Sequence, residues 1–291
     1  MENKKLKEMA VRAASGVVML LLFAGAVLWS KWSAAALFAV IMIGGLVEFF
    51  KLCRAKGYQP MYAFGIFVSI FLFGSLSLSH ILWGGSIDVV TLVLLLFLLV
   101  AFIPAIFICE IWRKSATPIE NIATTLMGII YVALPMGLLN FIPGLLIGDK
   151  GGWNPWVLLA FVSLIWANDV FAYLVGVTCG KHRLCERISP KKSWEGFVGG
   201  ILGSVAVGAI AAAVLGENYA FWMGLAVVVA LSSVVGDLIE SMFKRDAGVK
   251  DSGNILPGHG GMLDRFDALI VSAPFAFVYI TIAMIILNCC N

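Results

Sequence analysis

The chain has 291 residues, of which 61% are hydrophobic and only 13% are charged. A soluble domain carries about 25% charged residues and could not bury so much apolar surface, so this composition excludes a soluble domain, a disordered chain and a disulfide scaffold. The net charge of +3 is too small to indicate a nucleic-acid partner. We therefore expect an all-α, polytopic integral membrane protein.

Apolar segments long enough to cross a bilayer follow one another along the chain. We expect about nine transmembrane helices of about 20 residues each, at residues 11–30, 32–51, 61–82, 87–109, 121–147, 156–178, 196–215, 219–241 and 266–288. The fifth is the least uniform because Pro135 and Pro143 interrupt it, which neighbouring helices can compensate. The first also resembles a signal peptide, but a second span follows it at once, which favours a membrane helix.

The basic residues lie almost entirely in alternate connections between these spans. Of the 20 lysines and arginines, Lys31 and Lys150 are the exceptions. Because cytoplasmic loops carry the excess of lysine and arginine, this asymmetry places the N-terminus in the cytoplasm and the C-terminus outside. We expect a single membrane domain over residues 1–291, with N-terminal transmembrane helices in 1–150 and catalytic helices and cytoplasmic loops in 151–291.

Carboxylates within the spans are few, and they differ in what they indicate. Glu48 and Glu110 lie near the ends of the second and fourth spans, where a structural or interfacial role is the first expectation. Asp169 follows Asn168 in the middle of the sixth span, where a carboxylate is costly unless it is paired or faces water. We therefore expect Asp169 to be functional, with a hydrogen bond between helices as the alternative.

The connection after the sixth span carries five basic residues just before a helix begins, namely Lys181, Arg183, Arg187, Lys191 and Lys192. A helix N-terminus offers free N–H groups and a positive dipole end, so this segment favours phosphate binding. The alternative is contact with anionic lipids. Cys179, His182 and Cys185 lack a fourth ligand at a usual spacing, so zinc is not expected. Glycines from residue 196 to residue 208 indicate close helix packing.

Residues 236–267 form the most informative segment. Asp237, Glu240, Ser241 and Lys244 follow one another at i, i+3, i+4 and i+7, which places them on one face of a helix end. A glycine-rich turn follows at 257–261, and Asp264 and Asp267 stand three residues apart where the last span begins. Carboxylates beside cations suit Mg²⁺ and a polyphosphate. The chain has neither a P-loop nor a Rossmann motif, so a different nucleotide site is expected.

This segment resembles the signature of the phosphatidate cytidylyltransferases, also called CDP-diglyceride synthases. The signature reads Ser-x-x-Lys-Arg, Lys-Asp, Pro-x-His-Gly-Gly and Asp-Arg-x-Asp, and its parts stand here at residues 241–245, 250–251, 257–261 and 264–267. Asn168-Asp169 and residues 189–196 also match, although Ser193 stands where threonine is at least as common in the family. The resemblance covers roughly residues 165–270, and the first half matches only as hydrophobic spans.

Together with the residue chemistry, the resemblance implies that CTP and phosphatidate react to give CDP-diacylglycerol and pyrophosphate. It implies Mg²⁺ and leaves a second, monovalent cation open. Asp237 and Asp264 are the expected main metal ligands, with Asp267 and Asp169 as further ligands. Asp237, Asp264, Ser241 and Lys244 are the expected catalytic residues. The expected substrate-binding residues are Lys191, Lys192, Arg245, Lys250, His259 and Arg265.

The expected partners are CTP, phosphatidate and membrane lipids, with a second copy of the chain as a further candidate and no nucleic acid. We expect the bacterial inner (plasma) membrane, with the active site facing the cytoplasm, where CTP is found.

Two alternatives stay open. A CTP-dependent lipid kinase would use similar groups but transfer the γ-phosphoryl group. An ion-coupled transporter would use Glu48, Asp169 and Asp237 as relay carboxylates, but it predicts polar residues on both sides of the membrane.

Overall fold

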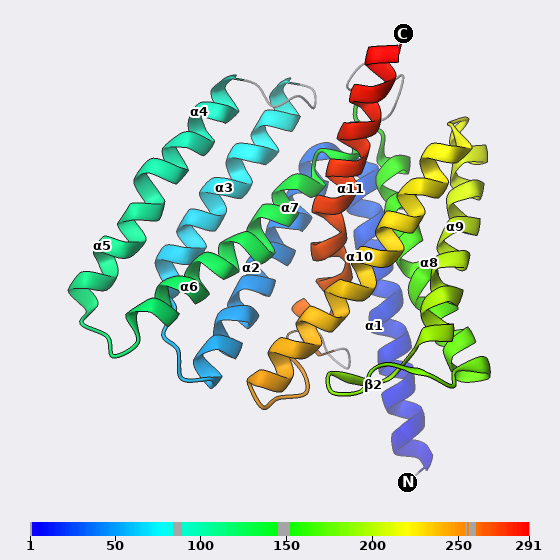
Figure 1. Ribbon diagram of the computed structural model, residues 1–291, viewed down its shortest axis with the longest axis horizontal. Helices are drawn as coiled ribbons and strands as arrows, with labels where there is room; N and C mark the ends of the chain where they lie inside the picture. The colour runs from blue at the N-terminus through cyan, green and yellow to red at the C-terminus, as the bar shows by residue number, and fades with distance from the viewer. Residues whose placement is uncertain (1, 84–88, 145–151, 254, 256–259, 291) are drawn as a thin grey trace. The chain divides into compact units, whose positions relative to one another are not determined.

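The structure is a computed structural model that describes residues 2–83, 89–144, 152–253, 255 and 260–290 (Figure 1). These residues are almost entirely helical, and their only sheet is a two-stranded hairpin. They form two compact units. Unit 1 is Met1–Asn140 with Phe243–Phe266, and unit 2 is Phe141–Met242 with Asp267–Asn291. The single domain expected from the sequence stays a prediction.

Unit 1 is built from the N-terminal helices and the segment between the last two helices. Its elements are α1 (Glu2–Trp29), α2 (Lys31–Ala55), α3 (Tyr62–Trp83), α4 (Val89–Phe97), η1 (Leu98–Phe102), α5 (Ile103–Arg113), α6 (Pro118–Gly128), η2 (Ile129–Ala133) and α7 (Leu134–Leu139). Helix α2 packs beside α3, α6 and α7 (Figure 1). The two π-helical turns, η1 and η2, come just before Pro104 and Pro135. Because proline removes a backbone donor and its ring crowds the preceding turn, it explains why these two spans are interrupted.

Unit 2 holds the helices of the second half. Its elements are η3 (Ile142–Gly144), α8 (Pro155–Cys179), β1 (Arg183–Cys185), β2 (Ser189–Ser193), α9 (Trp194–Leu215), and most of α10 (Tyr219–Asp246) and α11 (Leu263–Cys290). Helices α8 and α9 run side by side (Figure 1). A Cβ atom at Gly200 would lie 2.5 Å from Asn168 Oδ1, and one at Gly203 would overlap the Phe171 ring. The close approach of the two helices therefore requires glycine, as the small-residue pattern predicts.

The expected all-α, polytopic membrane fold is confirmed. Eight helices among the described residues are long and apolar enough to cross a membrane, and α1 adds a shorter apolar stretch, Ser15–Trp29. Each of the expected spans coincides with a helix or a proline-interrupted pair of helices. The orientation of the termini stays a prediction. The β-hairpin was not expected, because the segment between α8 and α9 lacks the alternating pattern typical of strands.

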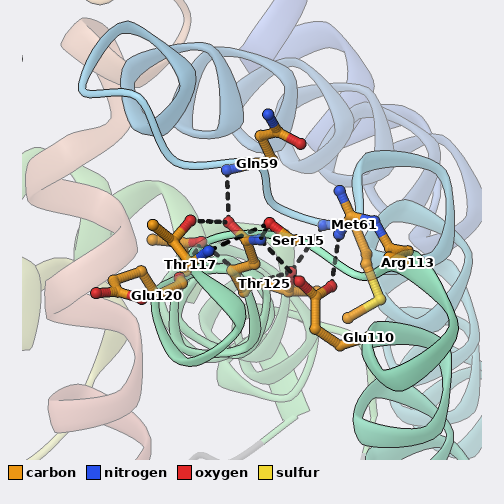
Figure 2. A network of polar contacts seen from close by, with 10 residues as sticks. Gln59, Met61, Glu110, Arg113, Ser115, Thr117, Glu120 and Thr125 are labelled. Carbon is orange, nitrogen blue, oxygen red and sulfur yellow. Dashed lines mark hydrogen bonds and ion pairs between the residues drawn. The ribbon is translucent and has the colours of Figure 1, made fainter.

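A buried polar network joins two connections of unit 1 (Figure 2). Its centre is Asn121, whose Oδ1 accepts a hydrogen bond from Gln59 N at 2.6 Å and whose Nδ2 donates to Glu110 Oε1 at 2.8 Å. Thr125 Oγ1 accepts from Met61 N at 2.9 Å. The network also includes Arg113, Ser115 and Thr117. It ties the α2–α3 connection to α5 and α6, which agrees with the structural role expected for Glu110.

Asn121→Ala should lower the melting temperature of the detergent-solubilised protein. The substitution leaves a backbone donor and a buried carboxylate oxygen without partners, at about 1–3 kcal/mol each. We expect a decrease of about 4–8 °C in a thermal-shift measurement. Gln59→Ala is the matched control, because Gln59 contributes its backbone N–H while its side chain is exposed. Equal melting temperatures for wild type and Asn121→Ala would contradict a stabilising role.

Candidate active site

Three carboxylates of unit 2 converge at the ends of two helices. Asp237 and Glu240 lie one turn apart on α10, Asp267 lies on α11, and one oxygen of each is within 4.8 Å of the others. Gly236 allows this approach, because a Cβ atom there would lie 2.7 Å from the Asp267 carbonyl oxygen. Glu240 and Asp267 are only 1% and 9% exposed. The two helices therefore present a compact set of acidic side chains, of which Glu240 and Asp267 are buried and Asp237 is partly exposed.

This group fits a hard divalent cation. All its donors are carboxylate oxygens, which hard cations prefer over nitrogen or sulfur. Carboxylates this close repel one another, and a cation between them would relieve the repulsion. Among the described residues it is the one group of three or more acidic, histidine or cysteine side chains with such spacing. Cys179, His182 and Cys185 belong to no such group within the part of the chain that the structure describes.

Further polar side chains of unit 2 surround Asp237. Lys192 Nζ on β2 lies 2.6 Å from Asp237 Oδ2, and Ser241 Oγ donates a hydrogen bond to Asp237 Oδ1 at 3.2 Å. Asp169 on α8 interacts electrostatically with both Lys192 and Asp237. Asn168, next to Asp169, is fully buried and donates to Ser233 Oγ at 2.9 Å. The structure thus brings Asp169, Lys192 and Ser241 to the carboxylate group.

The β-hairpin that carries Lys192 is fixed to the start of α9. Glu195, in the first turn of α9, accepts hydrogen bonds from the backbone N–H groups of Lys181 and His182. His182 Nδ1 lies 2.6 Å from Glu195 Oε1. Ser193 caps the helix by accepting from Gly196 N at 3.2 Å. These contacts hold the basic strand against the helix N-terminus, so Lys192 has a defined place beside Asp237.

Asp264 is in unit 1 and has a different environment. Lys244 Nζ lies 2.7 Å from Asp264 Oδ1, and the backbone N–H groups of Ser252 and Gly261 donate to Oδ2 at 3.0 and 2.9 Å. The Lys244 and Asp264 side chains are 13% and 8% exposed, so this ion pair is well shielded from water. Asp264 therefore organises the lysine and the α10–α11 connection, and its metal-binding role stays a prediction.

A second ion pair of unit 1 offers a contrast. Lys56 Nζ lies 2.7 Å from Asp246 Oδ1, with the side chains 40% and 59% exposed. The hydrogen bond to Asp246, reinforced by its charge, raises the pKa of Lys56. An exposed pair of this kind contributes little to stability.

The other expected substrate-binding residues lie on the surface. Lys191, Arg245, Lys250 and Arg265 are exposed, and His259 lies outside the described residues. Glu240 was not among the expected ligands, although it is three residues from Asp237 on the same helix face. That spacing was the available signal, but a single sequence does not tell which face of α10 meets α11.

Known proteins of one family are similar to this chain along almost its whole length. The sequence model described as "Cytidylyltransferase family" matches residues 10–283. A phosphatidate cytidylyltransferase of Synechocystis sp. is 33% identical over 302 residues, covering 95% of this chain and 98% of that protein. The phosphatidate cytidylyltransferase of Staphylococcus haemolyticus is 32% identical, covering 91% and 96%. That of Mycobacterium bovis is 35% identical over 61% of each chain.

The family match and the relatives' similarity identify the family of this chain. The chain belongs to the cytidylyltransferase family and is a nucleotidyltransferase. This family membership argues against the alternative function as an ion-coupled transporter.

Glu240→Gln should weaken the binding of a divalent cation to the purified protein. The change removes the negative charge of one of the three carboxylates while keeping the side-chain shape. With Mn²⁺ as the probe, we expect an affinity at least about tenfold lower by electron paramagnetic resonance. Glu120→Gln removes the same charge from an exposed position on α6 and should leave the affinity unchanged. Equal Mn²⁺ affinity in wild type and Glu240→Gln would exclude Glu240 as a ligand.

Proposed function

We propose that this member of the cytidylyltransferase family makes CDP-diacylglycerol and pyrophosphate from CTP and phosphatidate. The observation that carries the proposal is the carboxylate group beside Lys192, in a chain that matches phosphatidate cytidylyltransferases over nearly its full length. Such a site can hold both the cation and the phosphates that the reaction requires.

The reaction joins two anions, which defines the task of the site. An oxygen of the phosphatidate phosphate attacks the α-phosphorus of CTP and forms a new P–O bond. The bond from the α-phosphorus to the oxygen bridging the α- and β-phosphates breaks, and pyrophosphate leaves with that electron pair. The lipid phosphate is already ionised near pH 7, so no general base is needed. Positioning and charge neutralisation are therefore the main contributions of the protein.

Asp237, Glu240 and Asp267 are the residues whose geometry best supports binding of Mg²⁺, with Asp169 close by. Mg²⁺ bound there would neutralise phosphate oxygens as charge shifts toward pyrophosphate. Asp264 remains an expected ligand from the sequence, but its oxygens are engaged by Lys244 and backbone N–H groups. A second, monovalent cation stays an expectation from the resemblance.

The basic side chains have the complementary role of binding phosphates. Lys192 is nearest the carboxylate group, and the exposed Lys191 follows it on the same strand. Ser241 donates to Asp237 and so orients that carboxylate. Lys244, Arg245, Lys250 and Arg265 are proposed to hold further phosphate oxygens, since lysine and arginine are the side chains that do so through charge-assisted hydrogen bonds.

The protein is an integral membrane protein, and we place its active site at the cytoplasmic face of a bacterial plasma membrane. The asymmetric lysines and arginines support this orientation, and the relatives are bacterial. The phosphatidate head group would meet CTP at this face while its acyl chains stay in the bilayer. A second copy of the chain stays a candidate partner.

Transfer of label from CTP tests the reaction directly. Purified protein in mixed micelles with phosphatidate, Mg²⁺ and CTP labelled at the α-phosphorus should move the label into the lipid fraction. CTP labelled at the γ-phosphorus should release labelled pyrophosphate and leave the lipid unlabelled. Label in the lipid only from the γ-position would show a lipid kinase instead. Without phosphatidate, neither label should enter the lipid.

Asp237→Asn and Asp264→Asn should each lower kcat at least about a hundredfold, while the protein stays folded. Asp237→Asn removes a charge from the carboxylate group, and Asp264→Asn removes the charge that holds Lys244. Asp246→Asn is the matched control, because it breaks an exposed aspartate–lysine pair of unit 1. Turnover by both variants within a few-fold of wild type would contradict these roles.

A further inference from the structure

Glu48 is a buried carboxylate that the proposed reaction does not use. It lies on α2, is 0% exposed and is surrounded along the helix by apolar side chains. Its Oε1 atom has no hydrogen-bond partner among the described residues. Leaving a buried carboxylate oxygen unsatisfied costs free energy. A glutamate at this position therefore destabilises the fold unless its carboxylate has a role beyond filling space.

The Glu48 carboxylate contacts the segment between α10 and α11 at Ser252 and at the start of α11. Its Oε2 atom accepts a hydrogen bond from Ser252 Oγ at 3.0 Å and another from Leu263 N at 2.8 Å. Leu263 is the first residue of α11, so Glu48 satisfies a free N–H group at a helix N-terminus. The negative charge also lies favourably at the positive end of that helix.

The backbone approaches this carboxylate closely at two glycines, Gly253 and Gly261. A Cβ atom at Gly253 would overlap Glu48 Oε1, and one at Gly261 would overlap Glu48 Oε2. The backbone on both sides of the connection therefore comes as near to Glu48 as glycine permits.

Ser252 links Glu48 to Asp264, which in turn binds Lys244, one of the residues expected to bind phosphate. Its hydroxyl donates to Glu48 while its backbone N–H donates to Asp264 Oδ2. The other oxygen of Asp264 binds the Lys244 ammonium at 2.7 Å. A continuous series of hydrogen bonds thus links Glu48 to Lys244 within unit 1. Lys250 and Arg265, both exposed, lie two residues from Ser252 and Leu263, respectively.

We infer that Glu48 is a positioning residue for phosphate binding, which fixes the α10–α11 connection so that Lys244, Lys250 and Arg265 meet the triphosphate of CTP in a set arrangement. This inference rests on the proposed function. Ordering the cations in advance lowers the conformational entropy that substrate binding must remove. Loss of Glu48 should therefore affect the KM for CTP more than kcat.

The test compares Glu48→Ala and Glu48→Gln with Glu110→Ala. Glu110 is also a buried carboxylate of unit 1, but it accepts hydrogen bonds from Asn121 and Arg113. We expect the KM for CTP to rise about tenfold in Glu48→Ala, with a smaller change in kcat. Glu48→Gln keeps an oxygen that can accept from Ser252 and Leu263, and it should recover most of the affinity. Glu110→Ala should lower the melting temperature and leave the KM unchanged.

Ser252→Ala provides a second, milder variant. It removes one hydrogen bond to Glu48 and should raise the KM for CTP in the same direction but less. The effects of Ser252→Ala and Glu48→Ala should be less than additive in the double variant, because both break the same link.

Hydrogen exchange separates this inference from the proposed function. In Glu48→Ala, peptides containing the Ser252 and Leu263 amides should exchange faster than in wild type and in Glu110→Ala, whatever reaction the enzyme catalyses. Unchanged exchange would overturn the anchoring role. Faster exchange with an unchanged KM for CTP would show a purely structural anchor and overturn the positioning role. If wild-type protein transfers no α-label to lipid, the proposed function fails and no KM can be measured. The dissociation constant for CTP then takes the place of KM, and an equal value in wild type and Glu48→Ala would overturn the positioning role.

Discussion

The structure depends on how a chain with so few charges accommodates its carboxylates. In a low-dielectric interior, an acidic side chain needs hydrogen-bond donors or a cation close by. Glu110 is satisfied by Asn121 and Arg113 at the junction of two connections. One oxygen of Glu48 accepts hydrogen bonds from a hydroxyl and a helix N-terminus, and Asp264 is satisfied by a lysine and two backbone N–H groups. The contacts of Glu48 join segments 204 and 215 residues apart, whereas the partners of Glu110 and Asp264 lie at most 20 residues from them in the sequence.

The carboxylate group of unit 2 differs from these buried carboxylates, because its three acidic side chains lie next to one another. Asp237, Glu240 and Asp267 place acidic oxygens within 4.8 Å of one another, where like charges repel, and Lys192 lies beside Asp237. A site that concentrates like charges in this way sacrifices stability for the capacity to bind a cation. Gly236 makes the arrangement possible, because any larger residue would separate the two helices that supply the ligands.

Local features could be predicted from the sequence, whereas features that depend on packing could not. Bilayer thickness sets the length of an apolar span, so the helix positions follow directly from hydropathy. Asp237 and Asp267 were expected in the metal site, but Glu240 was not, because convergence with α11 depends on tertiary contacts. Glu48 shows the limit most clearly: its hydrogen-bond partners lie 204 and 215 residues away, and nothing near it in the sequence indicates them.

The lysines divide into two groups that suit successive steps of anion binding. Lys192 and Lys244 are each held by an aspartate at 2.6 and 2.7 Å, which orders a flexible side chain before any phosphate arrives. Lys191 and Lys250 are exposed and close to them in the chain, so their charge extends into the surrounding solvent. Exposed cations accelerate the encounter with a polyanion, whereas ordered ones reduce the entropy lost when it binds. In the reaction proposed above, Lys191 and Lys250 would therefore attract the anionic substrates, and Lys192 and Lys244 would hold them.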